Sequence, residues 1–431
     1  MRKRENVLCI SFAVGGGHTQ AAKERIKQLR KNCADIHIIE KDLIVDLVNP
    51  LFGKIVHKFL NLALKKRWVR IRNLIFSGQP LADQVVLFPS VFIATLITLI
   101  KHDIDKVIST QPVGILAMSK AILVAEKFLK KEISFELVIP ELPTAKAVSF
   151  FTPIQRLKPF YKKRLLLTSV HPYCEFGKTD AEFWMQNCGI DSKQVSYAHF
   201  PVRSEFLLPD NQAISREKTQ SLSLQFKAKE FESLMPFYKK DTVTLNRDKQ
   251  SISVNISPST ILTTIMLGSR PLEKTLLNYA RSFVKAVPEN NLPYNHCIIL
   301  ICSDTASIIS PAFTKLKKAL KNLPSVAKLT ILPIPFQEAS TLAPLILRSD
   351  ATITCSGGMT SIELMQFARG KIWIHSDFLD KTWKSASSRE MPIWEIGNAE
   401  YLIHKRQAVI INPRSLQSEY MKLVTDINQQ A

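Results

Sequence analysis

The chain has 431 residues, of which 46% are hydrophobic, so it is long enough for two ordinary domains and too apolar to be disordered. Lysine and arginine number 58 against 37 aspartates and glutamates, and the net charge of +21 favours an anionic partner. The sequence carries no zinc-finger spacing, ribonucleoprotein aromatic motif or basic-region heptads, so we do not expect that partner to be nucleic acid.

Seven cysteines are scattered along the chain, and none is spaced Cys-x-x-Cys. This usage argues against a disulfide framework or a zinc site and predicts a reducing compartment. Residues 1–6 run directly into a strand pattern without the apolar stretch of a secretory signal. We therefore expect a cytoplasmic protein.

Short apolar runs with strand character alternate with helix-compatible stretches in both halves of the chain. In the first half they lie at residues 7–12, 36–40, 106–110, 134–140 and 164–169. In the second half they lie at residues 261–267, 297–302, 328–332, 351–355 and 371–375. This rhythm predicts parallel sheets with helices on both faces.

The fold class we expect is α/β, with two Rossmann-like domains facing an interdomain cleft. A polar segment at residues 215–258, rich in Ser, Lys and Gln, separates the two halves. The expected domains are residues 1–206 and residues 261–431, joined by a linker or surface insertion at residues 207–260.

Residues 51–76 form a basic amphipathic stretch whose apolar side chains recur at helical spacing: Phe52, Ile55, Val56, Phe59 and Leu60. Clustered cations follow at residues 65–72, beside Trp68. This composition suits a helix at the surface of an anionic membrane, and it equally suits a crossover helix with a solvated basic face. Residues 85–100 lack charge but are too short for a membrane span, and they predict a buried crossover helix.

Two strand–glycine–helix units provide candidate anion sites. The first is Gly15-Gly16-Gly17-His18, and the second runs from Ser356 to Glu363 as Ser-Gly-Gly-Met-Thr-Ser-Ile-Glu. Free backbone N–H groups at a helix N-terminus bind anions. Neither loop matches the Walker phosphate loop or the full dinucleotide fingerprint, which argues against an ATPase or a dehydrogenase.

Four segments in order resemble motifs of GT-B glycosyltransferases of the monogalactosyldiacylglycerol synthase and processive diacylglycerol glucosyltransferase type. The peptidoglycan lipid-intermediate N-acetylglucosaminyltransferase is a more distant relative. The four segments are Gly15 to Ala22, Phe200 to Phe206, Ser356 to Glu363 and Trp394 to Leu402. The chain departs from the family at Glu141 to Lys146, where lysine replaces the family's histidine, and at the glycine-poor loop around Gly268.

The resemblance implies roles for individual residues. His18 would be the catalytic base, with Glu141 assisting or substituting. The nucleotide sugar would be bound by Gly268, Ser269, Arg270, Ser356, Gly357, Gly358, Thr360, Glu363, Glu395 and Asn398. Gly16, Gly17, Thr144 and Arg203 would lie on the acceptor side. The same residues also suit structural roles: a packed histidine, capping side chains, turn glycines and a solvated helix glutamate.

The reaction that the resemblance implies is inverting transfer of a hexose from a UDP-sugar to a lipid hydroxyl, with diacylglycerol as the first acceptor to consider. No metal or other cofactor is required, because helix N-termini and arginine neutralise the leaving diphosphate. Asp103 and Asp105 fit the Asp-x-Asp pattern of metal-dependent transferases but directly precede a strand, as a solvated loop would. We expect a cytoplasmic protein peripherally attached to an anionic membrane.

Two alternatives remain open from the sequence. The same donor chemistry serves a protein or small-molecule acceptor equally well. A degenerate transferase that acts as a binding or membrane-interaction module is the other alternative, because of Lys146 and the eroded Gly268 loop.

Overall fold

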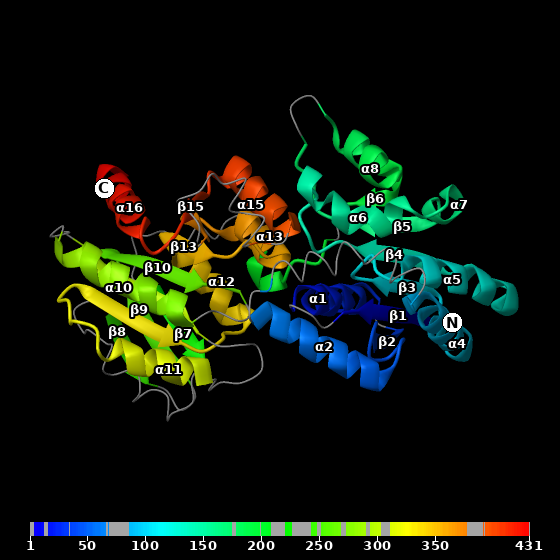
Figure 1. Cartoon of the computed structure of the whole chain (residues 1–431), viewed down its shortest axis with the longest axis horizontal. Coiled ribbons are helices and arrows are strands. Elements are labelled where there is room, and N and C mark those ends of the chain that lie inside the picture. The colour runs from blue at the N-terminus through cyan, green and yellow to red at the C-terminus, as the bar shows by residue number, and fades with distance from the viewer. Residues whose placement is uncertain are drawn as a thin grey trace. The chain divides into compact units, whose positions relative to one another are not determined.

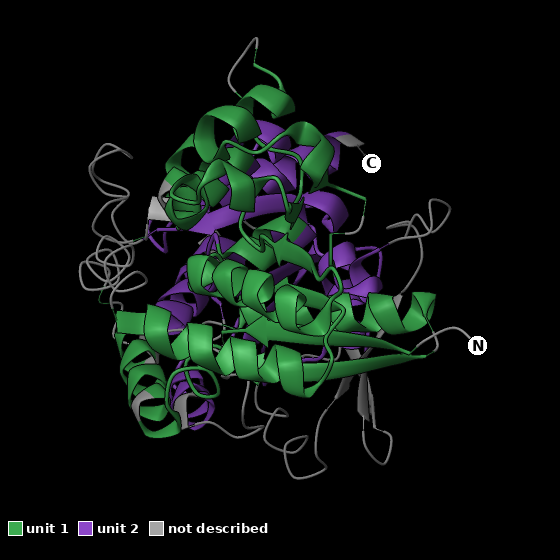
Figure 2. Ribbon diagram, turned by 90° about the vertical axis from the view of Figure 1, so that its right-hand side faces the viewer, with its two compact units in different colours: residues 1–202, 357–362, 387–401 green, residues 203–356, 363–386, 402–431 purple. Residues whose placement is uncertain are grey.

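The computed structural model shows two compact units (Figure 2). Unit 1 comprises residues 1–202, 357–362 and 387–401, and unit 2 comprises residues 203–356, 363–386 and 402–431. The residues that the structure describes are 4–12, 16–33, 35–65, 68, 86–174, 178–198, 200–207, 220–225, 243–247, 251–268, 273–289, 294–302, 311–376, 391 and 393–430. Gly15, Ser269, Arg270 and most of the basic run at residues 65–72 lie outside them.

Unit 1 contains a six-stranded parallel sheet with the order β2-β1-β3-β4-β5-β6 (Figure 1). Its strands are β1 (Glu5–Ser11), β2 (Ile36–Asp42), β3 (Lys106–Ser109), β4 (Ser134–Val138), β5 (Leu165–Thr168) and β6 (Val195–Ser196). The chain turns to one side of β1 for β2 and then to the other side for β3. This reversal is a topological switch point, where open α/β sheets bind ligands beyond the carboxyl ends of the strands.

The helices of unit 1 cover the sheet through one large apolar cluster, which joins strands with α4, α5, α6 and α8. The helices are α1 (Gly17–Asn32), α2 (Pro50–Lys65), α4 (Phe88–Lys101), α5 (Ile115–Leu129), α6 (Val148–Gln155), α7 (Pro159–Lys162) and α8 (Asp180–Cys188). The sequence predicted a buried helix at residues 85–100. Helix α4 instead buries only one side, at Val91 and Leu99, and exposes Ile93 and Ile97 on the other.

Unit 2 contains a second six-stranded parallel sheet, with the order β12-β11-β10-β13-β14-β15. Its strands are β10 (Thr260–Met266), β11 (Asn295–Ile301), β12 (Leu329–Ile334), β13 (Ala351–Thr354), β14 (Lys371–His375) and β15 (Val409–Ile411). Counted from β10, this is the Rossmann order 3-2-1-4-5-6, and its switch point lies between β10 and β13. The predicted α/β class with two Rossmann-like sheets is confirmed.

The helices described in the second half are α10 (Glu273–Glu289), α11 (Pro311–Leu320), α12 (Ala339–Arg348), α13 (Gly358–Phe367), α15 (Ile393–Arg406) and α16 (Leu416–Gln430). Of these, α10, α11 and α16 pack on the sheet through a separate apolar cluster that includes Tyr279, Phe283 and Tyr420. The sequence placed residues 357–362 and 387–401 in the second domain. Their contacts group them with unit 1, because α13 and α15 begin against the loop that follows β4.

The segment expected to be a linker or insertion contains three strands of an antiparallel sheet in the order β7-β9-β8. They are β7 (Gln220–Gln225), β8 (Val243–Arg247) and β9 (Ser251–Ile256). Val254 and Ile256 of β9 are fully buried, so this sheet is packed on one side.

Both six-stranded sheets carry buried thiols, and none of the seven cysteines forms a disulfide. Cys9 lies on β1 and Cys297 on β11. Burial raises the pKa of each of these two thiols to about 12, so neither forms a thiolate at neutral pH. Their environment is that of inert core side chains.

Candidate active site

His18 lies in the first turn of α1, just beyond the carboxyl end of β1. Gly16, which caps this helix, has a φ of 85°, a left-handed conformation that favours glycine. Nδ1 of His18 lies 2.6 Å from the carbonyl oxygen of Thr110, the residue that follows β3. The histidine thus connects the ends of β1 and β3, the two strands at the switch point of the unit 1 sheet.

The hydrogen bond to Thr110 determines the tautomer of His18. A carbonyl oxygen only accepts, so Nδ1 carries the proton and Nε2 keeps a free lone pair. The imidazole stacks on the ring of Phe150, with centroids 6.0 Å apart and planes 17° apart. Burial lowers the pKa of His18 below its ordinary value of 6.5, and the hydrogen bond to Thr110 offsets only part of this effect. A neutral imidazole with an available Nε2 is suited to general-base catalysis.

Glu141 lies in the loop after β4, where Asn398 of α15 holds it. The amide nitrogen of Asn398 donates to Oε2 of Glu141 at 2.9 Å, and Oδ1 of Asn398 accepts from the backbone N–H of Leu142 at 3.1 Å. Asn398 is fully buried. The expected contact of Asn398 with a sugar stays a prediction, whereas the structure shows this side chain orienting the Glu141 loop.

Helix α15 approaches the same loop at two further positions. A Cβ added to Gly397 would overlap Oγ1 of Thr144, the side chain that caps the short turn at Ala145–Ala147. Lys146, at the position where the resembled family has histidine, forms an ion pair with Glu400. Glu395 lies half-buried in the first turn of α15, and its contact with a sugar stays a prediction.

The glycine-rich turn before α13 packs against the loop as well. Gly358 fits so closely that a Cβ there would overlap the carbonyl oxygen of Pro140 and the carboxylate of Glu141. Gly357 has open space around its Cα, and Thr360 is half-buried in the first turn. The first N–H groups of a helix have no intrahelical partner, so this turn retains the donors that a phosphate needs.

In unit 2, Ser356 and Gly268 follow β13 and β10, the two strands at the switch point of that sheet. Ser356 is fully buried. Gly268 has a φ of 80° and open space where a side chain would begin. Both residues thus lie at the carboxyl edge of the unit 2 sheet, and their contact with a nucleotide sugar stays a prediction.

Arg203 and Glu363 form a bidentate ion pair in unit 2. Nε and Nη2 of Arg203 donate to the two carboxylate oxygens of Glu363 at 2.6 and 2.5 Å. Both side chains are largely buried, at 14% and 4% exposure. The sequence assigned Glu363 to ribose and Arg203 to the acceptor. The structure shows the two side chains paired with each other, as a buried carboxylate requires a cation, and their contacts with ribose and acceptor stay predictions.

Sequence reasoning missed three residues near His18. Thr110 forms a hydrogen bond with it, Gln111 directly follows Thr110, and the ring of Phe150 stacks on the imidazole. Thr110 and Gln111 were detectable in principle, since they end the apolar run expected as a strand. Phe150 carries no sequence signal, because it comes from α6, well over 100 residues from His18.

Within the described residues, no group of three or more His, Cys, Asp or Glu side chains is arranged to hold a metal ion. Asp103 and Asp105 both form ion pairs with Nζ of Lys131, at 2.7 and 2.6 Å. The Asp-x-Asp pair is thus engaged by a cation of its own unit.

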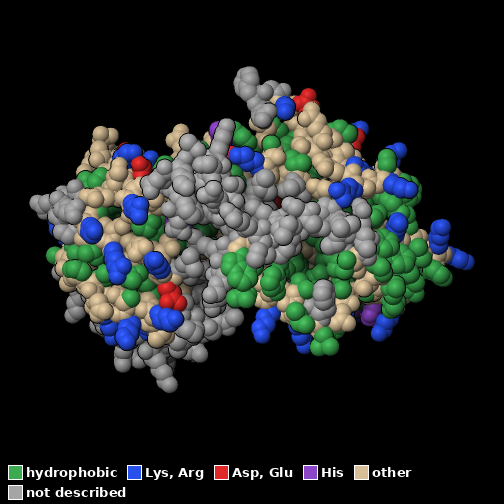
Figure 3. Space-filling view, in the orientation of Figure 1, with side chains coloured by type: hydrophobic (Ala, Val, Ile, Leu, Met, Phe, Trp, Pro, Cys, Tyr) green, Lys and Arg blue, Asp and Glu red, His purple; other side chains and the backbone are tan. Residues whose placement is uncertain are grey.

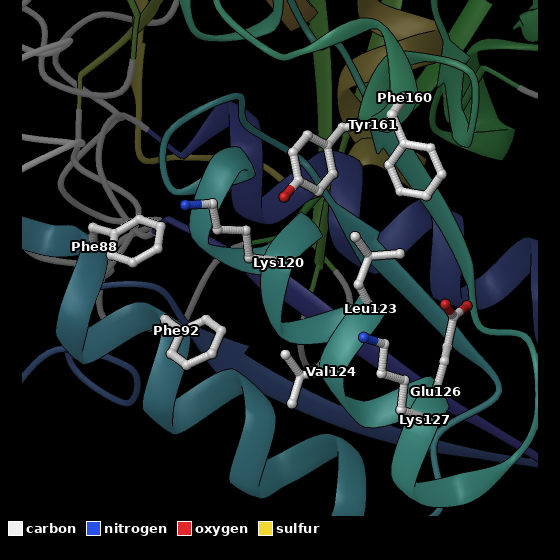
Figure 4. Close-up of a pocket in the computed structure, with 9 residues that line it drawn as sticks. All are labelled: Phe88, Phe92, Lys120, Leu123, Val124, Glu126, Lys127, Phe160 and Tyr161. Carbon is white, nitrogen blue, oxygen red and sulfur yellow. The ribbon is translucent and has the colours of Figure 1, made fainter.

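An open apolar groove of about 770 Å³ lies between α4, α5 and α7 (Figure 4). It is lined by Phe88, Phe92, Lys120, Leu123, Val124, Glu126, Lys127, Phe160 and Tyr161. Nζ of Lys120 lies 4.9 Å from the centroid of the Phe88 ring, and Glu126 is paired with Arg164. Figure 3 shows apolar side chains gathered over α4 and α5, with lysine and arginine side chains around them.

Helix α2 exposes a second apolar surface, which we call the α2 stripe: Leu51, Ile55, Phe59 and Leu62. Their spacing of four, four and three residues places them on one helix face. Lys54 and Lys58 are exposed beside them, and Gly53 packs against the backbone of Val45 on the inner side. In the part of the chain that the structure describes, no helix has the length and apolarity needed to traverse a bilayer.

No protein-family model and no curated protein matches the sequence. Among solved structures, MurG of Acinetobacter baumannii is 14% identical, with a TM-score of 0.46 over 98% of this chain and 92% of that chain. A UDP-GlcNAc 2-epimerase of Methanocaldococcus jannaschii is 12% identical, with a TM-score of 0.46 over 98% and 92%. A UGT transferase of Siraitia grosvenorii, solved with UDP, is 10% identical, with a TM-score of 0.49 over 97% and 90%.

All three TM-scores lie below 0.5. The fold class therefore rests on the two observed strand orders, and the function is argued from the residues of the site.

Proposed function

We propose that the protein is an inverting glycosyltransferase that moves a hexose from a UDP-sugar to a lipid hydroxyl at a membrane surface. The observation that carries the proposal is the state of His18 at the switch point of the unit 1 sheet. Its proton is held on Nδ1 by Thr110, its lowered pKa keeps the ring neutral, and its Nε2 is left to act as a base. The four segments that resemble motifs of GT-B transferases, and follow the same order along the chain, support the same proposal.

In this mechanism Nε2 of His18 removes the proton of the acceptor hydroxyl. The acceptor oxygen attacks the anomeric carbon, the bond from that carbon to the diphosphate oxygen breaks, and UDP leaves with the electron pair. Attack opposite the leaving group inverts the anomeric centre. The donors of the turn at Gly357 and Gly358, with the hydroxyl of Thr360, would bind the diphosphate and stabilise its charge.

A lipid acceptor is supported by the two exposed apolar surfaces of unit 1, each accompanied by lysines. The α2 stripe lies beside Lys54 and Lys58, and the groove between α4, α5 and α7 includes Lys120 and Lys127. Apolar side chains that insert between lipids, combined with cations that meet anionic head groups, are the chemistry of a peripheral membrane protein.

The test is a donor screen. Purified protein would be incubated with UDP-glucose, UDP-galactose or UDP-N-acetylglucosamine and vesicles that contain diacylglycerol and anionic lipid, and UDP release would be measured. We expect release with at least one donor, loss of release in His18→Ala, and unchanged UDP affinity in that variant. A folded protein that releases UDP from none of these donors would remove the enzyme proposal.

A second candidate is a degenerate transferase that binds without catalysing. The Arg203–Glu363 pair favours it, because both carboxylate oxygens that the family resemblance assigns to ribose are engaged by a guanidinium. Calorimetry separates the two candidates: a transferase binds UDP, and absence of UDP binding supports the second candidate.

A further inference from the structure

Strand β2 forms one edge of the unit 1 sheet, and in the described part of the chain no other strand lies along its outer side (Figure 1). It has seven residues, contains neither proline nor glycine, and is half-buried or exposed along its whole length. The other three edges of the two six-stranded sheets are short or protected. β6 and β15 have two and three residues, and β12 is buried at all six of its residues and contains Pro333. Of these four edges, β2 is the one that offers a template for a further strand.

The alternation of backbone groups shows which residues of β2 face outward. The N–H of Leu43 donates to the carbonyl oxygen of Ser11 at 2.8 Å, just beyond the ladder between β1 and β2. Residues two apart on a strand direct their backbone groups to the same side, so the odd-numbered residues of β2 bond to β1. Ile36, Ile38 and Glu40 therefore direct their N–H and C=O groups away from β1.

The open part of this edge ends at Asp42, whose N–H donates to Oδ2 of Asp46 at 2.6 Å. Within the described ranges, no other segment bonds to the backbone of Ile36, Ile38 or Glu40. Unpaired groups in a row on an edge strand readily accept the strand of another chain.

Antiparallel pairing of β2 with β2 of a second copy uses all of these groups in one register. Opposite residues of an antiparallel pair exchange both hydrogen bonds or neither, so an outward-facing residue has to oppose another outward-facing residue. With Ile38 on the twofold axis, the two Ile38 residues oppose each other, and Ile36 of each copy opposes Glu40 of the other. Each of these three pairs exchanges two bonds, which gives about six hydrogen bonds in total.

The same register is complementary in charge. Asp35, which directly precedes β2, falls opposite Lys41 of the second copy, and the twofold symmetry repeats this pair. The side chain of Asp35 is 70% exposed and lies 3.8 Å from Nε of Arg4, so it is open to a second cation. Centring the axis on Glu40 instead would set two glutamates against each other, which is destabilising. Charge complementarity therefore favours a second copy as the partner, in the register centred on Ile38.

We propose that two copies of this chain associate through antiparallel pairing of their β2 strands, with Ile38 on the twofold axis. The two unit 1 sheets then form one continuous sheet across the dimer. The contact is closed, because both copies use the same edge and neither β2 strand keeps an open side. The proposal goes beyond the proposed function and does not depend on it, because no residue of the candidate active site takes part.

Cross-linking of introduced cysteines tests the register. At the axis the two Ile38 Cα atoms lie about 5.5 Å apart, whereas the two Ile36 Cα atoms lie about 14 Å apart. We expect Ile38→Cys in the full chain to form a covalent dimer with a short reagent that bridges neighbouring thiols. Ile36→Cys is the matched control on the same edge and should remain uncross-linked, and the wild-type protein with its seven cysteines sets the background. Cross-linking of Ile36→Cys as readily as Ile38→Cys would contradict the register.

Sedimentation velocity of the full chain over a range of concentrations measures the dimer itself. Ile38→Pro removes the N–H at the axis and leaves the ladder with β1 intact, so the dimer Kd should rise at least about tenfold. Lys41→Asp should raise it about tenfold as well, because it sets two aspartates opposite each other. Adding Asp35→Lys to Lys41→Asp should restore the wild-type Kd, because the ion pairs form again with their charges exchanged.

Circular dichroism and thermal unfolding verify that each variant is folded, and the charge exchange keeps the test decisive if Ile38→Pro destabilises the sheet. A wild-type protein that stays monomeric at every concentration would leave this edge to a different chain or to another segment of this one, and would overturn the proposal. A dimer whose Kd is unchanged in both Ile38→Pro and Lys41→Asp would also overturn it, because such a dimer uses another surface.

Discussion

The side-chain amide of Asn398 donates a 2.9 Å hydrogen bond to the carboxylate of Glu141, although 257 residues separate the two in the sequence. The same amide accepts from the backbone of Leu142. A loop and a helix whose sequence motifs were recognised independently therefore form one hydrogen-bonded structure, in which Asn398 of α15 holds Glu141 after the end of β4.

We expect Asn398→Ala to lower the free energy of unfolding by about 1–3 kcal/mol, because it leaves the buried N–H of Leu142 without a partner. The variant should also lose transfer activity as the Glu141 loop relaxes. Urea denaturation followed by circular dichroism measures the first effect. The control is Asn187→Ala on α8, where the amide donates to the carbonyl oxygen of Phe183 in its own helix. Equal destabilisation by both substitutions would contradict the interpretation.

The acid limb of the pH profile should report His18. Burial lowers the pKa of this imidazole below its ordinary value, so the acid limb of kcat/KM should lie at lower pH than an ordinary histidine would give. Phe150→Ala admits water beside the ring, which raises the pKa toward its ordinary value and moves the acid limb to higher pH. Measurement of kcat/KM between about pH 5 and pH 8 tests both statements. A wild-type midpoint above 6.5 would assign the base to another group.

The two glycines at the start of α13, Gly357 and Gly358, should differ sharply in their tolerance of a side chain. A methyl group at Gly358 overlaps Pro140 and Glu141, whereas Gly357 has open space, so the two alanine variants form a matched pair. We expect Gly358→Ala to cost about 1–3 kcal/mol of stability and Gly357→Ala to cost little. Thermal unfolding of both variants checks this, and similar melting temperatures would show that the loop after β4 yields easily.

The Arg203–Glu363 pair should behave as a buried ion pair. Arg203→Met leaves the carboxylate of Glu363 buried without its cation, and we expect a loss of about 3–5 kcal/mol. The double variant Arg203→Met with Glu363→Gln should recover most of that loss, because no uncompensated charge remains. Chemical denaturation of the single and double variants gives the coupling energy. If the double variant is as unstable as Arg203→Met, the ion pair is not what stabilises this region.

The α2 stripe should contribute to binding of anionic vesicles. Ile55 is 67% exposed and Phe59 is 43% exposed, so replacing both by glutamate should reduce vesicle binding at least about tenfold without unfolding the protein. Met185→Glu on α8 serves as the control, because Met185 is 54% exposed and lies outside the stripe. Sedimentation with vesicles at two salt concentrations is the measurement. Unchanged binding of the double variant would favour a soluble acceptor.

The sequence predicted those parts of the fold that depend on local patterns. Ten apolar runs correspond to strands of the two sheets, and the glycines at Gly16 and Gly268 mark turns with positive φ. The short strands β6 and β15 were missed because two or three residues carry no periodic signal. The strands β7 to β9 were missed because their sequences are polar.

The residues of the candidate site likewise divide into those that local sequence patterns predict and those that only the folded structure reveals. His18, Gly358 and Ser356 were identifiable because a strand, a glycine turn and a helix follow each other in the sequence. The hydrogen-bond partners of His18, Glu141 and Glu363 were not identifiable. These partners are Thr110, Asn398 and Arg203, which lie 92, 257 and 160 residues away in the sequence. Glu363 illustrates the difference: its position suggested a ligand contact, and only the packed structure shows the arginine beside it.

The inert thiols at the centres of the two sheets supply an internal probe of each unit. Cys9 belongs to unit 1 and Cys297 to unit 2, and an alkylating reagent reaches either sulfur only when its own sheet opens. Mass spectrometry of the two cysteine-containing peptides after timed alkylation would therefore report how readily each half of the molecule opens, without any engineered label.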